Sequence, residues 1–293
     1  MRSIRKLYFQ NAAGARLGLN GEAGIFATAL AGFGFSLAPS FADLNRGFFT
    51  TVGDANEPQN TLAFTIVLTS DPYTTHQSLV DWLAAAGTLT VVYDPTGKRE
   101  YCRDVTVSFI QKGELNQAGW LELPCSFTCA TPWYLPFPTT MHLSSSAVDE
   151  GKHYDYTYDE DLCYGPNSAA SMSAVIGCSG HIPGALQLTF RGAVTNPKLR
   201  LVGNVSGQTV GVCSLSVALG DTDRLEFSSL YENSYVRRIG ADGSETDLLD
   251  ALDLSLTPFF HIPVDEPCTL SIEADASFTG QADLLVYYYF RSV

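Results

Sequence analysis

The sequence predicts a mainly β protein with one principal helix. From residue 186 onward the chain is a succession of short apolar runs separated by turn residues, the spacing expected of a β-sandwich. Its 25 glycines and 14 prolines favour many turns over long helices. One earlier segment, residues 79–86, has helical periodicity. With 293 residues the chain is long enough for two domains, and we expect them at residues 1–142 and 143–293.

The opening residues predict a hairpin and two further strands. Residues 7–10 and 15–19 lie on either side of the turn-rich residues 11–14. Residues 23–42 carry no charge, but glycine, serine and proline dilute their hydrophobicity, so we expect strand structure and no membrane span. Residues 60–68 (NTLAFTIVL) predict the next strand.

The helix is predicted from one apolar stripe. Leu79, Trp82, Leu83 and Ala86 have the i, i+3, i+4, i+7 spacing of a single helix face. This spacing would bury one side of the helix against a sheet.

The flanking residues suit the two ends of such a helix. Ser70 and Asp71 can accept hydrogen bonds from N–H groups of the first turn, and Pro72 is tolerated at a helix start. Gly87 tolerates the left-handed conformation that often ends a helix.

A strand, a tight turn and a long hairpin are expected after the helix. Residues 88–93 (TLTVVY) are rich in β-branched side chains, and residues 94–97 (DPTG) have the composition of a tight turn. Apolar residues then alternate with polar ones over residues 104–109. Residues 120–128 supply the returning strand.

The middle of the chain contains two aromatic-rich segments. Residues 131–137 (TPWYLPF) contain prolines that interrupt pairing and three aromatics that we expect to cover an apolar surface. Residues 144–164 are acidic and rich in tyrosine, and we interpret them as a connector strand docked on a domain surface. The carboxylates at 155, 159, 160 and 161 lack the spacing and the glycine of a calcium loop, so no metal site is expected.

Six short runs predict the strands of the second domain. They are LQLTF (186–190), KLRLV (198–202), VCSLSVAL (212–219), RLEF (224–227), TLSIEAD (269–275) and LLVYYYF (284–290). Residues 235–248 predict a hairpin that turns at Asp242 and Gly243, a pair that accepts positive φ angles.

The net charge of −14 is concentrated in the second half. Residues 1–142 carry nine Lys and Arg against eleven Asp and Glu, whereas residues 143–293 carry eight against twenty. An acidic surface repels phosphate backbones, and no basic stripe with interleaved aromatics occurs outside residues 2–6. The charge therefore argues against sequence-specific binding of nucleic acid and is typical of a solvated outer face.

The seven cysteines lack the paired spacing of a metal site. Cys125 and Cys129 would lie about 13 Å apart on an extended strand, whereas a disulfide requires Cα atoms within roughly 7 Å. We expect buried free thiols and assembly in a reducing compartment.

Motifs of the common enzyme classes are absent from the sequence. It contains no HExxH, no GxSxG and no glycine-rich phosphate loop. A glycosidase needs two suitably placed acids, and four carboxylates are available: Glu226, Glu232, Asp242 and Glu273. Any acidic domain offers such pairs, and we expect the aromatics at 287–290 to pack largely into the core. We therefore expect no enzymatic activity, no catalytic residue, no metal and no cofactor.

Five segments, taken together and in this order, resemble one protein family. They are KLYFQNAAGARLGLNG (6–21), DPYTTHQSLVDWLAAAGTLTVVYDPTGKREYCRDVTV (71–107), FTCATPWYLP (127–136), HYDYTYD (153–159) and GHIPGALQLTFRGAVTNPKL (180–199). The chain resembles the distal tail proteins of long-tailed bacteriophages over most of its length.

This resemblance implies an N-terminal belt domain, with a β-barrel-like core plus a helix, and a C-terminal galectin-like β-sandwich. It implies a homo-hexameric ring that acts as the tail-tip, or baseplate, hub of the virion. The implied partners are the tail tube protein, the tail-associated tip protein and, in some phages, a receptor-binding protein. DNA would pass through the lumen, and assembly would take place in the bacterial host cytoplasm.

We chose candidate ring contacts by the potential of their strands to form exposed edges. They are Thr61, Phe64, Ile66, Leu68, Val105, Val107, Phe109, Leu121 and Leu123. Because DNA would pass through the lumen, five basic residues are expected on outer or subunit-contact surfaces. They are Arg5, Lys6, Arg16, Lys98 and Arg99. Two alternatives stay open at this point: a carbohydrate-binding protein for host recognition, and a glycosidase.

Overall fold

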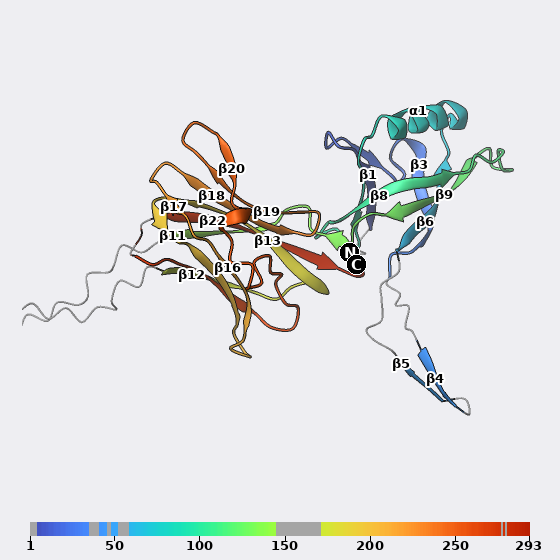
Figure 1. Cartoon of the computed structure of the whole chain (residues 1–293). Helices are drawn as coiled ribbons and strands as arrows, with labels where there is room; N and C mark the ends of the chain where they lie inside the picture. The colour runs from blue at the N-terminus through green and yellow to red at the C-terminus, as the bar shows by residue number, and fades with distance from the viewer. Residues whose placement is uncertain are drawn as a thin grey trace, which may run out of the picture. The chain divides into compact units, whose positions relative to one another are not determined.

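The computed structural model describes residues 5–34, 41–45, 48–51, 59–144, 171–276, 278 and 280–293. These residues form two compact units, one comprising Met1–Pro136 with Phe290–Val293 and the other Phe137–Tyr289. Both are built of antiparallel strands, and the α-helix lies in the first (Figure 1). The mainly β fold with one principal helix is thereby confirmed. The expected division at residues 142 and 143 stays a prediction.

The first unit contains a closed circuit of strands. Its strands are β1 (Lys6–Gln10), β2 (Arg16–Gly18), β3 (Ile25–Ala31), β6 (Thr61–Leu68), β7 (Leu89–Asp94), β8 (Tyr101–Ile110), β9 (Leu121–Cys129) and β10 (Trp133–Tyr134). The neighbours run β1-β7-β8-β9-β6-β3, all antiparallel. Leu19, just after β2, donates its N–H to Leu7 and accepts from Ala27 of β3. The circuit therefore closes as a small β-barrel.

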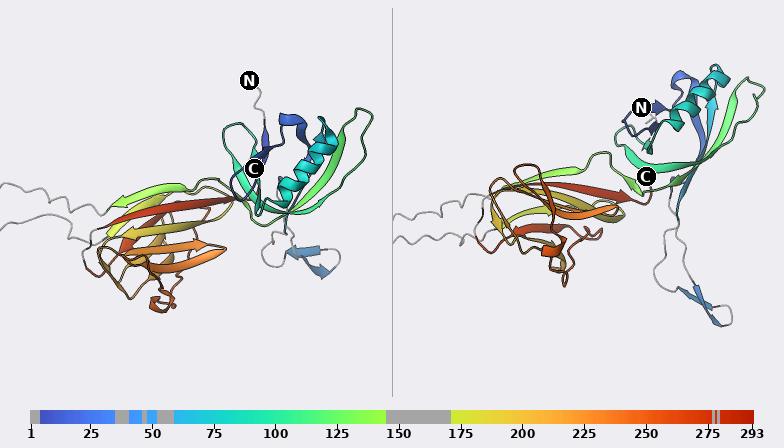
Figure 2. Two further views of the ribbon diagram at one scale, coloured as in Figure 1. Left: turned by 90° about the horizontal axis from the view of Figure 1, so that it is seen from above. Right: turned by 45° about the horizontal axis from the view of Figure 1, so that its top comes forward.

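The described part of the first unit contains three further elements. They are a 3-10 turn η1 (Glu22–Gly24), a separate ribbon of β4 (Phe41–Asn45) and β5 (Phe48–Thr51), and the helix α1 (Pro72–Ala84). Figure 2 shows α1 lying against the strands of the barrel.

Aromatic side chains fill the barrel and connect it to the helix. Phe127 lies 5.3 Å from Phe9 and 5.1 Å from Phe64 between ring centroids, and Phe9 and Phe127 are fully buried. Trp82 of α1 stacks on Phe9 at 6.5 Å. Burial of this cluster provides the hydrophobic core that fixes the helix on the barrel.

The predicted apolar face of the helix is confirmed, but its predicted N-cap is wrong. Leu79 is buried and Trp82 is half-buried, as the spacing requires. Asp71 is left-handed, with φ 39°, and its side chain caps no N–H group. Ser70 contributes instead through its carbonyl, which accepts a 2.8 Å hydrogen bond from Thr75 Oγ1. A helix N-cap normally has β-region torsions, and the left-handed torsion of Asp71 departs from that geometry.

The predicted turn after β7 is formed by one carboxylate and one glycine. Asp94 Oδ1 accepts hydrogen bonds from the N–H groups of Thr96, Gly97 and Lys98 at 3.1, 2.6 and 3.2 Å. Gly97 has φ 74°, a left-handed conformation that suits glycine. The predicted hairpin between residues 88–93 and the following strand is confirmed by the β7–β8 pairing.

The second unit is a sandwich of two sheets, as predicted. One sheet has the order β11-β22-β13-β18-β19-β20 and the other β12-β21-β15-β16. The strands are β11 (Thr139–Ser144), β12 (Ser171–Ile176), β13 (Ile182–Arg191), β15 (Lys198–Gly203), β16 (Thr209–Ser214), β18 (Arg224–Leu230), β19 (Asn233–Ile239), β20 (Glu245–Asp247), β21 (Cys268–Glu273) and β22 (Gln281–Phe290). Phe190, Phe227 and Phe260 are among the largest fully buried side chains of the core.

One strand predicted in the second unit is wrong. Residues 212–219 do not continue as one strand, because β16 ends at Ser214 and β17 (Ala218–Leu219) pairs with β14 (Val194–Thr195) instead. Leu215 still donates its N–H to the Pro197 carbonyl, in register with the β15–β16 ladder, but Pro197 has no N–H to return, so the pairing stops there. The 3-10 turn η2 (Leu249–Ala251) contacts the segment between β16 and β17, where the N–H of Ser216 donates to the Ala251 carbonyl. The hairpin turning at Gly243, with φ 81°, is confirmed.

Two expectations about individual side chains need correction. Trp133 is fully buried, but Phe137 is exposed, so only part of the 131–137 segment covers apolar surface. Among the described cysteines, five are buried and free, whereas Cys178 is exposed. Cys163 and the predicted connector at 145–164, with its four carboxylates, lie outside the described residues.

Candidate interaction surfaces

Most of the nine candidate ring contacts are part of the barrel core. Six of them are buried: Phe64, Ile66, Leu68, Val105, Leu121 and Leu123. Their side chains have no surface to offer to a neighbouring subunit, because the barrel itself uses them. Thr61, Val107 and Phe109 are exposed. The contact role of all nine stays a prediction. The exposed side chains of Thr61, Val107 and Phe109 are the ones that a neighbouring subunit could reach.

A β-bulge explains why Phe109 is exposed. Val107 pairs with Phe127, whereas Phe109 pairs with Ser126, so Ser108 is an extra residue in β8. The extra residue reverses the alternation of β8 and turns Phe109 to the outer face of the barrel wall. Phe109 is 52% exposed and Val107 is 36% exposed. Alternation in the sequence would have placed both side chains on one face.

Further exposed aromatics lie near the β8–β9 loop. Trp120, at the start of β9, contacts Phe26 edge-on at 6.2 Å and is still 40% exposed. The ammonium group of Lys112 lies 5.0 Å from the ring centroid of Tyr73 on α1, and Tyr73 is also exposed. Together with Val107 and Phe109, these side chains give the first unit an apolar surface that its own fold leaves exposed.

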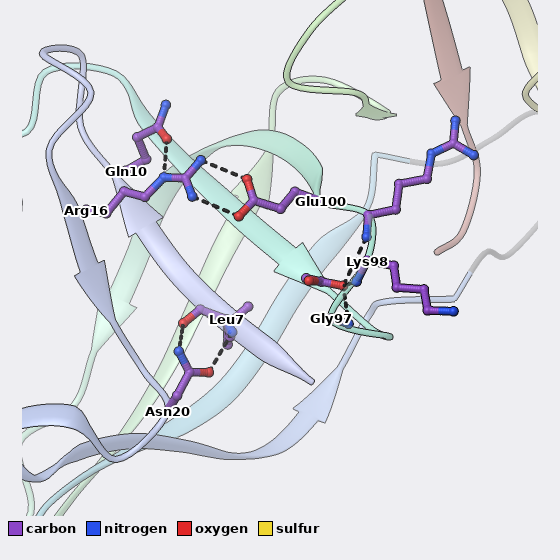
Figure 3. Close-up of polar contacts among 9 residues, drawn as sticks. Leu7, Gln10, Arg16, Asn20, Gly97, Lys98 and Glu100 are labelled. Atoms are coloured by element: carbon purple, nitrogen blue, oxygen red, sulfur yellow. Dashed lines mark hydrogen bonds and ion pairs between the residues drawn. The ribbon is translucent and has the colours of Figure 1, made fainter. Parts of the chain in front are cut away.

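The five basic residues expected on outer surfaces are all exposed. Arg16 forms a bidentate pair with Glu100, both contacts being 2.9 Å, and its Nε donates to Gln10 at 2.8 Å (Figure 3). Lys98 lies in the turn that Asp94 organises. The guanidinium group of Arg99 lies over the ring of Tyr101 at 5.4 Å. Whether these residues face a lumen depends on the ring and stays a prediction.

The carboxylates considered for a glycosidase do not form one cluster. Glu226 lies on β18 in the larger sheet and pairs with Arg237 at 2.8 Å. Glu273 lies on β21 in the other sheet and accepts from Ser271 of the same strand. Asp242 accepts from the N–H and hydroxyl of Ser244 within its turn. Among the described residues, no group of three His, Cys, Asp or Glu side chains could hold a metal ion.

The buried thiols have raised pKa values. Burial raises the pKa of Cys102, Cys125 and Cys213 to about 12. A thiol reacts as the thiolate, so these groups are chemically inert at neutral pH. They contribute apolar volume to the cores of the two units.

Residues 6–130 match the family model described as "Distal tail protein, N-terminal domain". The match identifies the N-terminal part of the chain as a distal tail protein N-terminal domain. The barrel and α1 lie within the matched residues. No curated protein has a matching sequence.

The fold of the chain resembles solved structures along nearly its whole length. A chain of the phage p2 baseplate in its activated conformation with Sr matches with a TM-score of 0.59 at 12% identity, covering 99% of this chain and 100% of that chain. The SPP1 Dit protein (gp 19.1) matches with a TM-score of 0.60 at 11% identity, covering 96% and 98%. These likenesses show a shared fold.

The match of residues 6–130 identifies a distal tail protein domain, and the structural likenesses add a fold shared along nearly the whole chain. In the part of the chain that the structure describes, no helix has both the length and the apolar character needed to cross a bilayer.

Proposed function

We propose that this protein is a distal tail protein and forms a homo-hexameric ring at the tip of the tail. The ring joins the tail tube protein to the tail-associated tip protein and offers an anchoring place for receptor-binding components. The observation that carries the proposal is the match of 96% of the chain to SPP1 Dit, a protein described as a paradigm of the hub adsorption apparatus in phages infecting Gram-positive bacteria.

Ring closure, with no catalytic step, is the proposed mechanism. Heterologous contacts close a ring only when the rotation between neighbouring subunits divides a full turn. A barrel closed through Leu19 and held by the Phe9, Phe64 and Phe127 cluster is a rigid body that can fix this angle. We place the ring-forming domain at residues 1–142.

The β8–β9 hairpin is the proposed contact, with exposed apolar side chains on both of its faces. Val107 and Phe109 would be covered by the neighbouring subunit, which removes apolar area from water. Thr61 lies at the start of β6, paired with Thr128 of β9, and would lie at the border of the same contact. Arg5, Lys6, Arg16, Lys98 and Arg99 are placed outside the lumen, so that few cations slow the passage of DNA.

Assembly in the reducing cytoplasm of the bacterial host is proposed from the thiol chemistry. The six described cysteines are all free. A reducing compartment keeps such thiols from forming wrong disulfides during folding.

Native mass spectrometry and negative-stain electron microscopy of the full chain test the ring. Phe109→Asp and Val107→Asp should convert rings to monomers, because a buried carboxylate opposes the contact. Val205→Asp is the matched control, since Val205 is an exposed apolar residue of the second unit. Circular dichroism spectra should be unchanged in all three variants.

A wild-type protein that stays monomeric, and makes no ring when mixed with tail tube protein, would refute the hub mechanism. Rings that persist in both aspartate variants would instead move the contact away from the β8–β9 hairpin.

A further inference from the structure

The outer face of the larger sheet of the second unit contains a pocket of about 430 Å³. Five strands contribute to it: β11, β22, β13, β18 and β19. Its polar lining is Thr140, His142, Gln187, Thr189, Glu226, Tyr235 and Asp283. The volume lies within the range of about 300 to 1,000 Å³ common for small-ligand sites.

Short side chains at the centre of the sheet produce the hollow. Thr189 on the central strand β13 is paired with Asp283 on one side and with Glu226 on the other. In the next row Gln187 is paired with Ser228, whose neighbour on β19 is Tyr235. Side chains of directly paired residues stand on the same face, so Thr189 lies on the floor of the pocket between taller neighbours.

One wall of the pocket is an anchored carboxylate. Asp283 Oδ2 accepts a 2.6 Å bond from Arg191, and Asp283 Oδ1 lies 2.7 Å from His142 Nδ1. These hydrogen bonds, led by that from Arg191, hold the pKa of the Asp283 carboxyl below its usual range. The carboxylate is therefore a fixed acceptor at neutral pH.

The opposite wall is also a carboxylate paired with an arginine, and an aromatic ring lies beside it. Glu226 accepts from Arg237, whose Nε and second terminal nitrogen lie 2.9 and 2.8 Å from Glu226 Oε2. Arg237 also pairs with Glu245 at 2.7 Å, and its guanidinium lies 4.6 Å from the centroid of Tyr235. The long side chains of this wall are thus held in position before any ligand arrives.

The charges of the two walls select the kind of ligand. Each carboxylate that lines the pocket already accepts from an arginine, and none of the Lys and Arg residues that the structure describes lines the pocket, so an anion finds no free positive charge there. The carboxylate oxygens of Glu226 and Asp283 accept from hydroxyl groups, while the amide N–H groups of Gln187 and the side-chain hydroxyls of the lining donate to them. Tyr235 and Leu285 add apolar surface to the lining.

We propose that this pocket binds a neutral saccharide. Several hydroxyl groups, each able to donate and accept, match the alternating acceptors and donors of the walls, and the C–H face of a sugar ring matches Tyr235 and Leu285. The pocket lies wholly within the second unit, so the inference does not depend on ring formation.

Isothermal titration calorimetry on the full chain tests the proposal. The probes are methyl glycosides of glucose, galactose, rhamnose and N-acetylglucosamine, with glucose 6-phosphate and glucosamine as charged counterparts. We expect saturable binding of at least one neutral glycoside, and weaker binding of the charged compounds.

Three variants locate the binding. Thr189→Phe fills the hollow on the outer face and should abolish binding. Glu226→Gln keeps the shape, leaves Arg237 paired with Glu245, and should weaken binding about tenfold, the loss expected for one hydrogen bond to a charged group. Ser173→Phe, on the exposed face of β12 in the other sheet, is the matched control and should bind as wild type.

The absence of binding by every neutral glycoside would overturn the proposal, as would equal binding by wild type and both pocket variants. Tighter binding of a charged compound, or of a peptide, would overturn the choice of a neutral saccharide. Native mass spectra of the same samples report ring assembly separately, so a failure of this inference is distinguishable from a failure of the hub mechanism.

Discussion

Asn20 hydrogen-bonds both main-chain groups of Leu7, and this contact helps to close the barrel. Its Oδ1 accepts from the Leu7 N–H at 2.7 Å, and its Nδ2 donates to the Leu7 carbonyl at 3.1 Å (Figure 3). The side-chain amide thereby continues the ladder between β1 and β2 beyond the last paired residue of β2. Leu7 itself is buried.

Replacing this side chain should destabilise the first unit. Asn20→Ala leaves the buried N–H of Leu7 without its acceptor, while the Leu7 carbonyl keeps its bond from Leu19. We expect a loss of about 1 to 2 kcal/mol in the free energy of unfolding, measured by urea denaturation. Asn20→Asp keeps the acceptor and should lose less. Equal stability of Asn20→Ala and wild type would show that the barrel closes without this contact.

The turn after β7 should be sensitive to a single methyl group. Gly97→Ala forces a side chain into a left-handed conformation with φ 74°, which should destabilise the first unit by about 1 to 2 kcal/mol. Gly34→Ala is the matched control, because a Cβ added at Gly34 would meet open space and Gly34 has no positive φ. Thermal melts of both variants against wild type make the comparison. A melting temperature for Gly97→Ala as high as that of Gly34→Ala would contradict the turn geometry.

Thiol alkylation should separate the cysteines by their environment. At about pH 8 the buried Cys102, Cys125 and Cys213 should resist iodoacetamide in the native protein, because their pKa values of about 12 leave almost no thiolate. Cys178 is exposed and should be modified. Peptide mass mapping identifies the modified sites, and alkylation in guanidinium chloride is the control in which every thiol reacts. Rapid native modification of Cys213 would show that the sandwich core opens.

The ion pairs of Asp283 should give the protein an acid-sensitive contribution to stability. The lowered pKa means that Asp283 stabilises the fold above the ordinary carboxyl pKa of about 3.9, and that this contribution is lost as the pH falls through the lowered value. Asp283→Asn should therefore melt at a lower temperature than wild type at about pH 6, and the difference should shrink as the pH falls below the ordinary carboxyl pKa of about 3.9.

A matched carboxylate provides the control for this titration. Asp250 is exposed, and no ion pair of Asp250 is found among the described residues. Asp250→Asn should follow the wild-type curve at every pH. A gap between Asp283→Asn and wild type that persists in acid would assign the loss to packing instead of charge.

Features set by neighbouring residues were predictable from the sequence. The helix face of Leu79 and Trp82, the Asp94–Gly97 turn and the Gly243 hairpin depend on torsions and spacing within a few residues of the chain. The order of five sequence segments also indicated the family. The predicted strand at residues 212–219 failed because of its partner strand: Pro197 accepts the N–H of Leu215 but has no N–H to return, so the pairing ends there.

The sequence by itself determined that the protein is mainly β, that it has one amphipathic helix and that the six cysteines in the described part of the chain are free. Only the tertiary structure decided which side chains of those elements remain on the surface. Alternation in the sequence distinguishes the two faces of a strand but does not show which strands pair with it. Pairing between strands that are distant in the chain decides the burial of Phe64 and Leu123, the bulge that exposes Phe109 and the pocket around Thr189.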